Sequence, residues 1–216
     1  MKGRRYETPA AFKAALEERL RRHGIAQLTR RRQLAIFDRF LARIAAVLGD
    51  AATLKGGLVL ELRLERARTT KDVDLRVMGS PDRIATRLQA IGKLDLGDFM
   101  TFEVVPHADH PTIQSDGLPY DGVRFRAACH LAQKIYGDPF GVDVVFGEPM
   151  FGEADVIVAD DVLGFAGVPP PQIRVYPVET HLAEKLHAYT LPRDGATNSR
   201  VNDLVDLVWL SGDTGG

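Results

Sequence analysis

Apolar side chains recur at helical spacing near the start of the chain. Phe12, Leu16 and Leu20 follow Thr8-Pro9, a pair that is typical of a helix N-cap with proline in the first turn. Gly24 ends the run. The spacing predicts one helix with a single buried face.

Residues 34–48 repeat this pattern with steps of three and four, which predicts a second helix. The same steps place Arg39 and Arg43 away from its apolar face. We expect the two helices to pack together as a hairpin.

The middle of the chain alternates apolar and polar residues, as half-buried strands do. In one such stretch Phe125 and Ala127 face one way, while Arg124 and Arg126 face the other. A helix predicted over 80–92 interrupts the strands. The predicted strands are 73–77, 99–105, 123–127 and 142–146.

Three prolines at 169–171 break the chain before its last part. A short strand, a helix, a polar loop and a final helix are predicted after them, at 173–176, 178–189, 192–199 and from 201. In the first of these helices, Leu182 and Leu186 are expected to face the core, and Lys185 to reach a cleft from another face. The order of elements predicts an α+β fold, in which a mixed twisted sheet is flanked by N-terminal and C-terminal helices.

The composition fits an ordinary globular protein, with 45% hydrophobic and 26% charged residues among 216. The sequence has no run of 18 uncharged apolar residues that could span a membrane. Its charged first residues are not followed by the apolar segment of a secretory signal, and both observations favour a cytoplasmic protein. The single cysteine, Cys129, excludes an internal disulfide and a cysteine-built zinc site.

The net charge of −1 hides a division along the chain. Residues 1–48 hold 12 Lys and Arg against 4 Asp and Glu, a net charge of +8, so the remainder carries −9. This arrangement fits either a contact with a polyanion or packing of the basic helices against the acidic body. The charges alone favour neither.

Two consecutive glycines, Gly56 and Gly57, follow Lys55 and mark the first candidate site. Glycines let the backbone approach a ligand closely, and free N–H groups at the start of a helix after them favour a phosphate. This stretch predicts an anion pocket.

Asp72 and Asp74 stand two apart on a predicted strand, so both side chains project from one face. Paired carboxylates are oxygen ligands suited to magnesium, which holds triphosphate oxygens in turn. A solvated strand face would have the same sequence.

A third carboxylate, Asp143, is the only charge in the apolar run 142–146. An unpaired buried charge is unfavourable, so it requires a partner or a metal. If this strand lies beside 73–77, three aspartates converge and can hold two metal ions for an in-line displacement.

These residues resemble the polymerase-beta-like nucleotidyltransferase superfamily, and two C-terminal motifs sharpen the likeness. Residues 181–188 (HLAEKLHA) and 198–207 (NSRVNDLVDL) are similar to the last motifs of the AbiEii/AbiGii toxin family, which includes the mycobacterial MenT toxins. With 55–57 and 70–74, the resemblance covers about residues 53–210.

The resemblance implies the activity and partners of a toxin in a toxin–antitoxin system. It would transfer NMP from an NTP substrate to the 3′ end of tRNA with Mg²⁺ or Mn²⁺, block translation, and have a cognate antitoxin. It also implies three segments: a helical segment 1–50 packed on the core, a nucleotidyltransferase core 51–168, and a helical segment 169–216 that completes the active site.

The resemblance also implies roles for individual residues. Asp72, Asp74 and Asp143 would hold metal, and Asp143 is the expected base or metal ligand near the attacking hydroxyl. Asp203 would orient the nucleotide or Lys185. The residues implied in nucleotide binding are Lys55, Gly56, Gly57, Thr70 and Lys185.

Two departures from the family pattern are present. Asn202 stands where the family usually has lysine, which would weaken phosphate binding. Fourteen residues separate Gly57 from Asp72, somewhat more than is usual, and this indicates a longer helix or loop.

The nature of the acceptor stays open at the level of sequence. Few aromatic residues are available to stack on bases, which favours recognition of tRNA by shape and charge. The candidate surfaces are the basic N-terminal helices and the cations Lys55, Arg66, Arg68, Lys71 and Arg76. The alternatives are a nucleotide sensor without turnover, an acceptor hydroxyl on a protein or small molecule, and use of the basic helices to bind an antitoxin.

Overall fold

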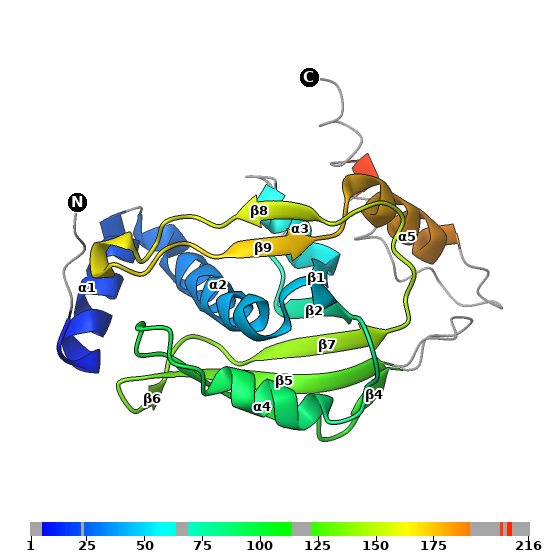
Figure 1. The fold of residues 1–216 in the computed structure, drawn as a ribbon. Helices are drawn as coiled ribbons and strands as arrows, with labels where there is room; N and C mark the ends of the chain where they lie inside the picture. Colours follow the sequence, from blue (N-terminus) through cyan, green and yellow to red (C-terminus); the bar gives the residue numbers. More distant parts are fainter. Residues whose placement is uncertain are drawn as a thin grey trace.

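The fold was analysed in a computed structural model, which describes residues 6–22, 24–63, 69–113, 122–190, 204, 207 and 208. Within these residues nine strands form one mixed sheet, with main order β3-β5-β7-β2-β1-β9-β8. Helices lie against this sheet and at its ends, as Figure 1 shows. The α+β class predicted from the sequence is confirmed.

The strands of the main order are β1 (Ala52–Lys55), β2 (Asp72–Val77), β3 (Thr101–Pro106), β5 (Gly122–Leu131), β7 (Phe140–Phe146), β8 (Asp155–Val158) and β9 (Gln172–Val175). Two short strands, β4 (Thr112–Ile113) and β6 (Lys134–Ile135), pair with β5. The pairs β2–β7 and β1–β9 are parallel and the others antiparallel. The predicted strands are confirmed, and β1, β4, β6 and β8 are additional.

The helices are α1 (Pro9–Arg22), α2 (Leu28–Leu48), α3 (Gly56–Arg63), α4 (Ile84–Gly92) and α5 (Val178–Thr190), with short 3-10 turns at Ile25–Gln27, Gly49–Ala51 and Gly164–Ala166. The predicted N-cap is confirmed, because the Thr8 hydroxyl accepts a hydrogen bond from the Ala11 N–H at 3.2 Å. No helix of the described ranges is long and apolar enough to cross a membrane.

The core fills the space between α2 and the sheet. Phe37 and Phe40 of α2 meet Phe140 of β7 with ring centroids 5.1 and 5.4 Å apart, and Phe40 also contacts Phe102 of β3. Figure 1 shows α2 running along the middle of the sheet. The strands therefore turn their apolar residues toward α2 and their alternate residues away from it.

Arg39 and Arg43 correct the expectation for the polar side of α2, because both are buried. Arg43 is fully buried and its guanidinium donates to Asp98 Oδ1 at 2.6 Å and to the Met100 carbonyl at 2.6 Å. Arg39 donates to Asp98 Oδ2 at 2.7 Å. A prediction from the hydrophobic pattern places every charged side chain at the surface. Here the aspartate that Arg39 and Arg43 share, Asp98, allows both arginines to be buried.

Candidate active site

Four charged residues form a row across four neighbouring strands. In register, Lys55 of β1 lies opposite Asp74 of β2, Asp74 opposite Asp143 of β7, and Asp143 opposite Arg124 of β5. Paired residues of adjacent strands point to the same face, and Asp72 shares that face two residues before Asp74. The three aspartates predicted from the sequence thus share one sheet face, opposite the face that packs on α2.

Two glycines make room for two of these carboxylates. A Cβ atom on Gly56 would overlap the carboxylate of Asp74, and one on Gly141 would overlap that of Asp72. Gly56 also has φ of 70°, a left-handed conformation that favours glycine. The Gly-Gly turn is therefore packed directly against the acidic strand.

Gly57 and Thr70 are the other two uncharged residues that the resemblance assigns to nucleotide binding. Gly57 is buried in the first turn of α3, so the predicted helix after the glycines exists and begins at Gly56. The Thr70 N–H donates to Glu61 at 3.1 Å, and its hydroxyl lies 3.4 Å from the Asp72 nitrogen. Thr70 thereby fixes the start of β2.

Asp74 lies in an unfavourable electrostatic environment. Burial, together with the negative charge of Asp143, raises the pKa of Asp74 to about 6. Lys55 and Lys185 act in the opposite direction and lower this pKa. Burial and the neighbouring aspartates thus disfavour the charged form of Asp74, which a bound cation would stabilise.

Asp143 is paired with Arg124. The guanidinium donates from Nε to Oδ1 at 2.8 Å and from Nη2 to Oδ2 at 2.6 Å, so both carboxylate oxygens accept a hydrogen bond. These hydrogen bonds raise the pKa of Arg124, to which the charges of Asp72 and Asp74 also contribute. In this arrangement the positive charge of Arg124 compensates the negative charge of Asp143.

Lys55 lies between two glutamates. Its Nζ donates to Glu148 Oε2 at 2.5 Å and to Glu184 Oε1 at 2.8 Å, and the Tyr176 hydroxyl donates to the same Glu148 oxygen at 2.8 Å. Although burial acts to lower it, these carboxylates raise the pKa of Lys55. The amine that the resemblance assigns to nucleotide binding thus has two partners within the protein.

Glu184, the second partner of Lys55, has a raised pKa. Burial raises its pKa to about 7, Lys55 acts to lower this value, and the neighbouring Glu148 raises it further. The cluster of Lys55, Glu148, Glu184 and Tyr176 connects β1 to the helix α5, because Glu184 belongs to that helix.

Helix α5 faces the protein with a side other than the predicted one. Leu186 is 54% exposed, whereas Lys185 and His181 are buried. The aliphatic stem of a lysine can pack like an apolar residue while its amine reaches charged groups, which a purely apolar pattern does not anticipate. Lys185 therefore lies inside the protein, near enough to Asp74 to lower its pKa.

Several predicted residues lie outside the described part of the chain. These are Asp203, Asn202, Arg66 and Arg68. Of the predicted final helix, residues 204, 207 and 208 are described and helical.

Two of the three aspartates meet the requirements of a divalent cation. Asp72 and Asp74 fit, because they are carboxylates on one face and burial disfavours the charge of Asp74 until a cation binds. Both oxygens of Asp143 already accept hydrogen bonds from Arg124, so this carboxylate is engaged in the metal-free arrangement. Among the described residues no three His, Cys, Asp or Glu side chains are grouped closely enough to hold one metal ion.

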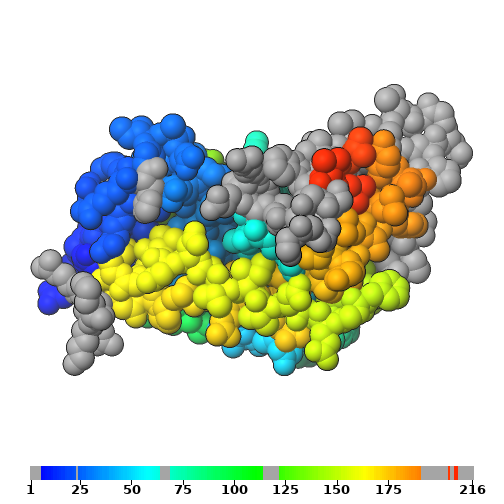
Figure 2. Space-filling view, turned by 90° about the horizontal axis from the view of Figure 1, so that it is seen from above, coloured from blue at the N-terminus to red at the C-terminus, as the bar shows by residue number. Residues whose placement is uncertain are grey.

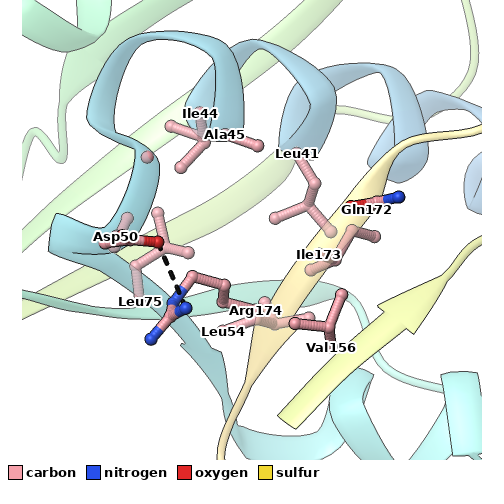
Figure 3. A pocket seen from close by; sticks show the side chains of 12 residues that line it. Leu41, Ile44, Ala45, Asp50, Leu54, Leu75, Val156, Gln172, Ile173 and Arg174 are labelled. Atoms are coloured by element: carbon pink, nitrogen blue, oxygen red, sulfur yellow. Dashed lines mark ion pairs between the residues drawn. The ribbon is translucent and has the colours of Figure 1, made fainter. Parts of the chain in front are cut away.

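A cavity of about 300 Å³ lies away from these residues, on the α2 side of the sheet. It is lined by apolar residues such as Leu41, Leu54 and Leu75, with Asp50 and Arg174 paired at 3.1 Å beside it, as Figure 3 shows. Leu54 and Leu75 each neighbour a member of the charged row in sequence and so point to the opposite face. This cavity is separate from the candidate active site.

The basic N-terminal helices use much of their charge within the protein. Arg30 pairs with Glu61 of α3, and Arg32 donates to both carboxylate oxygens of Glu17 at 2.7 and 2.8 Å. Arg39 and Arg43 share Asp98. Figure 2 shows α3 (cyan) between these helices (blue) and α5 (orange). Of the two interpretations of the +8 charge, these ion pairs favour packing against the acidic body.

Sequence reasoning did not single out Arg124, Glu148, Glu184 or Tyr176. A signal existed for Arg124, since the alternation of 123–127 sets it opposite Phe125 and therefore on the polar face. Glu184 stands beside Lys185 in the C-terminal motif. Glu148 and Tyr176 follow the ends of β7 and β9, and only the strand order β7-β2-β1-β9 brings them close together.

Comparison with known proteins gives a match over most of the chain. The family described as nucleotidyl transferase AbiEii toxin, Type IV TA system, matches residues 39–215. No curated protein matches.

Solved structures share the fold at low sequence identity. MenT4, a nucleotidyltransferase toxin from Mycobacterium tuberculosis H37Rv, is 17% identical, with a TM-score of 0.62 over 93% of this chain and 64% of that one. JHP933 from Helicobacter pylori is 14% identical, with a TM-score of 0.51 over 85% of this chain and 66% of that one. The chain thus spans about two thirds of the length of each.

Proposed function

The chain belongs to the AbiEii nucleotidyltransferase toxin family, and on this premise we propose that it transfers a nucleoside monophosphate from a nucleoside triphosphate to an acceptor hydroxyl. The observation that carries the proposal is the row of charged residues on one sheet face. It brings Asp72, Asp74 and Asp143 together beside the Gly-Gly turn.

The acids divide by position. Asp72 and Asp74 would hold a divalent cation, Mg²⁺ or Mn²⁺, which when bound neutralises triphosphate charge and the leaving pyrophosphate. Asp143 lies one strand further from the Gly-Gly turn. It is therefore assigned to the acceptor side, where its carboxylate can orient the hydroxyl and accept its proton once released from Arg124.

The positive charges divide in the same way. Lys185 is buried close to Asp74 and is assigned to the triphosphate as a point charge. The N–H groups at the start of α3, which begins at Gly56, are assigned to a phosphate. Lys55 contributes through Glu184, because this ion pair joins β1 to the helix that carries Lys185.

The C-terminal segment 169–216 is proposed to complete the site. Its strand β9 pairs with β1, and its helix α5 brings Glu184 to Lys55. The core 51–168 supplies the acids, and the segment 1–50 packs on that core. Asp203 is proposed to act beside Lys185.

The proposed acceptor is the 3′ end of tRNA, so that transfer blocks translation, and the proposed partner is a cognate antitoxin. The family description supports a toxin–antitoxin system. The exposed part of Arg124 at the open end of the charged row supports an acceptor with a phosphate backbone.

One observation favours a second function, a nucleotide sensor without turnover. Asp143 is fully paired with Arg124, which leaves two carboxylates for metal. Two ligands suffice to bind a metal–nucleotide complex, whereas in-line transfer also needs a group at the acceptor.

The deciding experiment incubates the protein with total RNA, Mg²⁺ and each labelled nucleoside triphosphate, beside Asp72→Ala. Label in RNA of tRNA size with the wild type but not with Asp72→Ala supports transfer to tRNA. Binding of nucleotide without label or pyrophosphate release supports the sensor. Pyrophosphate release without labelled RNA indicates a protein or small-molecule acceptor. Transfer by a folded Asp72→Ala variant would contradict the assignment of the acids.

A further inference from the structure

Arg124 makes the most directed contact in the candidate site. Its two hydrogen bonds to Asp143, at 2.8 and 2.6 Å, occupy both carboxylate oxygens in the geometry that a guanidinium and a carboxylate prefer. The Arg124 side chain is 38% exposed and that of Asp143 is 19% exposed. The pair is therefore partly accessible to solvent.

This contact competes with the chemistry assigned to Asp143. The acceptor hydroxyl assigned to Asp143 needs one of its oxygens, and a cation held by Asp72 and Asp74 would gain a further ligand if Asp143 were released. A guanidinium remains protonated throughout the accessible pH range, so Arg124 leaves this carboxylate by moving and not by titration.

Arg124 also interacts electrostatically with the other two aspartates, Asp72 and Asp74. Asp72 and Asp74 both act to raise the pKa of Arg124, so its charge compensates the whole acidic face. A cation bound to Asp72 and Asp74 would repel it, because two positive charges would then share one cluster of carboxylates.

We propose that Arg124 substitutes for the divalent cation in the metal-free protein and, when the cation binds, turns to the phosphate that precedes the acceptor hydroxyl. The proposal rests on the function proposed above. It adds a positioning residue that holds Asp143 before the reaction and a phosphate ligand once the acceptor has entered.

The assignment to the acceptor, and not to the triphosphate, follows from the order of the row. The groups assigned to the nucleotide, Lys185 and the start of α3, lie at the β1 side, because Glu184 of α5 binds Lys55 and Gly56 packs on Asp74. Arg124 is at the opposite end, two strands beyond Asp74. A planar guanidinium there can bind two phosphate oxygens at once.

The first test measures Mn²⁺ alone on the metal-free protein, by electron paramagnetic resonance of the free ion, without nucleotide or RNA. Removing a charge-assisted bidentate contact frees Asp143, so Arg124→Gln is expected to bind Mn²⁺ about five- to tenfold more tightly than the wild type. Unchanged or weaker binding by the folded variant would overturn the proposal.

A matched control separates this effect from the loss of one positive charge. Arg126→Gln makes the same change two residues along β5, on the same face, at an exposed side chain that has no ion pair to a carboxylate within the described chain. It is expected to change Mn²⁺ affinity by less than about twofold, because screened charges interact weakly. If both variants bind Mn²⁺ more tightly to the same extent, the effect is one of overall charge, and this would contradict a competition between Arg124 and the cation for Asp143.

Arg124→Lys provides a variant that keeps the charge. Lysine cannot donate two parallel hydrogen bonds to one carboxylate, so its Mn²⁺ affinity should lie between those of the wild type and Arg124→Gln. If Arg124→Gln does not fold, as judged by circular dichroism, this variant alone decides. Tighter Mn²⁺ binding than in the wild type supports the proposal, and equal binding overturns it.

The second test measures transfer kinetics. Arg124→Gln is expected to raise the KM for the RNA acceptor about tenfold, with the KM for the nucleotide within twofold of the wild-type value. A rise in the KM for the nucleotide instead would move Arg124 to the triphosphate and overturn its acceptor role. If the wild type shows no transfer, the proposed function fails, and the Mn²⁺ measurement still decides the competition with the cation.

Discussion

At the scale of single residues, the closest packing in the site is between Gly56 and Asp74. A methyl group at Gly56 would overlap the Asp74 carboxylate, and the backbone there is left-handed. We expect Gly56→Ala to abolish transfer and to lower the free energy of unfolding by about 2–4 kcal/mol, from strain plus the overlap. Urea unfolding and the RNA-labelling assay measure the two effects.

Gly97 offers a control for the strain alone. Its φ is 74°, almost the same as at Gly56, and no atom lies within 4 Å of the position that a Cβ would occupy. Gly97→Ala should lose only about 1 kcal/mol and keep its activity. Equal losses in the two variants would mean that contact with Asp74 contributes nothing.

Asp38 of α2 gives a prediction about pH. Burial, and next the charge of Asp160, raise its pKa from 3.8 to about 7. Because the folded state holds this proton more tightly than the unfolded state, the wild type should lose stability as the pH rises from about 4 to 7 and be level above that. Asp38→Asn removes the effect, so its advantage over the wild type should grow with pH to at most about 4 kcal/mol.

Thermal or urea unfolding at pH 4.5, 6 and 8 measures this advantage. Asp50→Asn serves as the control, since that carboxylate is 85% exposed and pairs with Arg174 at the surface. The free energy of unfolding of Asp50→Asn should equal that of the wild type at each of these pH values. An Asp38→Asn variant that is no more stable than the wild type at pH 8 would contradict the effect.

At the scale of elements, Asp98 joins α2 to the segment between α4 and β3. It accepts hydrogen bonds from Arg39 and Arg43, and none of the three side chains is more than 5% exposed. Asp98→Asn leaves two buried guanidinium groups without a counter-charge, and we expect the free energy of unfolding to fall by about 3–5 kcal/mol. Urea unfolding at pH 7 measures the loss.

An exposed ion pair provides the comparison for this prediction. Glu18 and Arg22 on α1 are 58% and 67% exposed and 3.7 Å apart. Glu18→Gln should change the free energy of unfolding by less than about 0.5 kcal/mol. A loss of similar size in both variants would show that burial of the Asp98 cluster has no particular effect.

The elements also show what a sequence can reveal. The helices α1, α2 and α4 and the strands β2, β5 and β7 were predicted because period and alternation directly report one buried face. The strands β1 and β8 were missed, because they are short and, unlike the equally short β9, are not set off by a break such as the three prolines at 169–171. Helix α5 was predicted with the wrong face, because Lys185 is buried and Leu186 exposed.

The arrangement of the acids was predictable where it depends on strand alternation, because residues two apart on a strand point to the same face. Alternation places Asp72 and Asp74 together, and the isolated charge of Asp143 indicated a shared site. The partners of these acids come from strand order, which local patterns do not contain: Arg124 reaches Asp143 because β5 pairs with β7, and Glu148 reaches Lys55 across the sheet.

At the scale of the whole molecule, part of the positive charge of the N-terminal helices holds these helices to each other and to the sheet. Arg32 of α2 binds Glu17 of α1, and the Tyr136 hydroxyl donates to the same carboxylate at 2.7 Å. Arg32→Gln is therefore expected to lower the free energy of unfolding by about 1–2 kcal/mol while the KM for RNA stays within about twofold.

Arg21→Gln removes an exposed arginine of the same helix pair and should leave both quantities unchanged. Unfolding in urea and transfer kinetics test the two variants together. A tenfold rise in the KM for RNA in the Arg21 variant would instead assign the basic helices to RNA.

The alternation of β2 has a consequence for folding as well as for chemistry. A shift of one residue between β2 and β7 would turn Asp72 and Asp74 into the core and Val73 and Leu75 toward solvent. Burial of two carboxylates without partners would be strongly unfavourable, so misaligned chains cannot settle into a compact state. Asp72 and Asp74 thus also disfavour the shifted register of β2 and β7. A chain that folds with the correct register has at the same time assembled its acidic face.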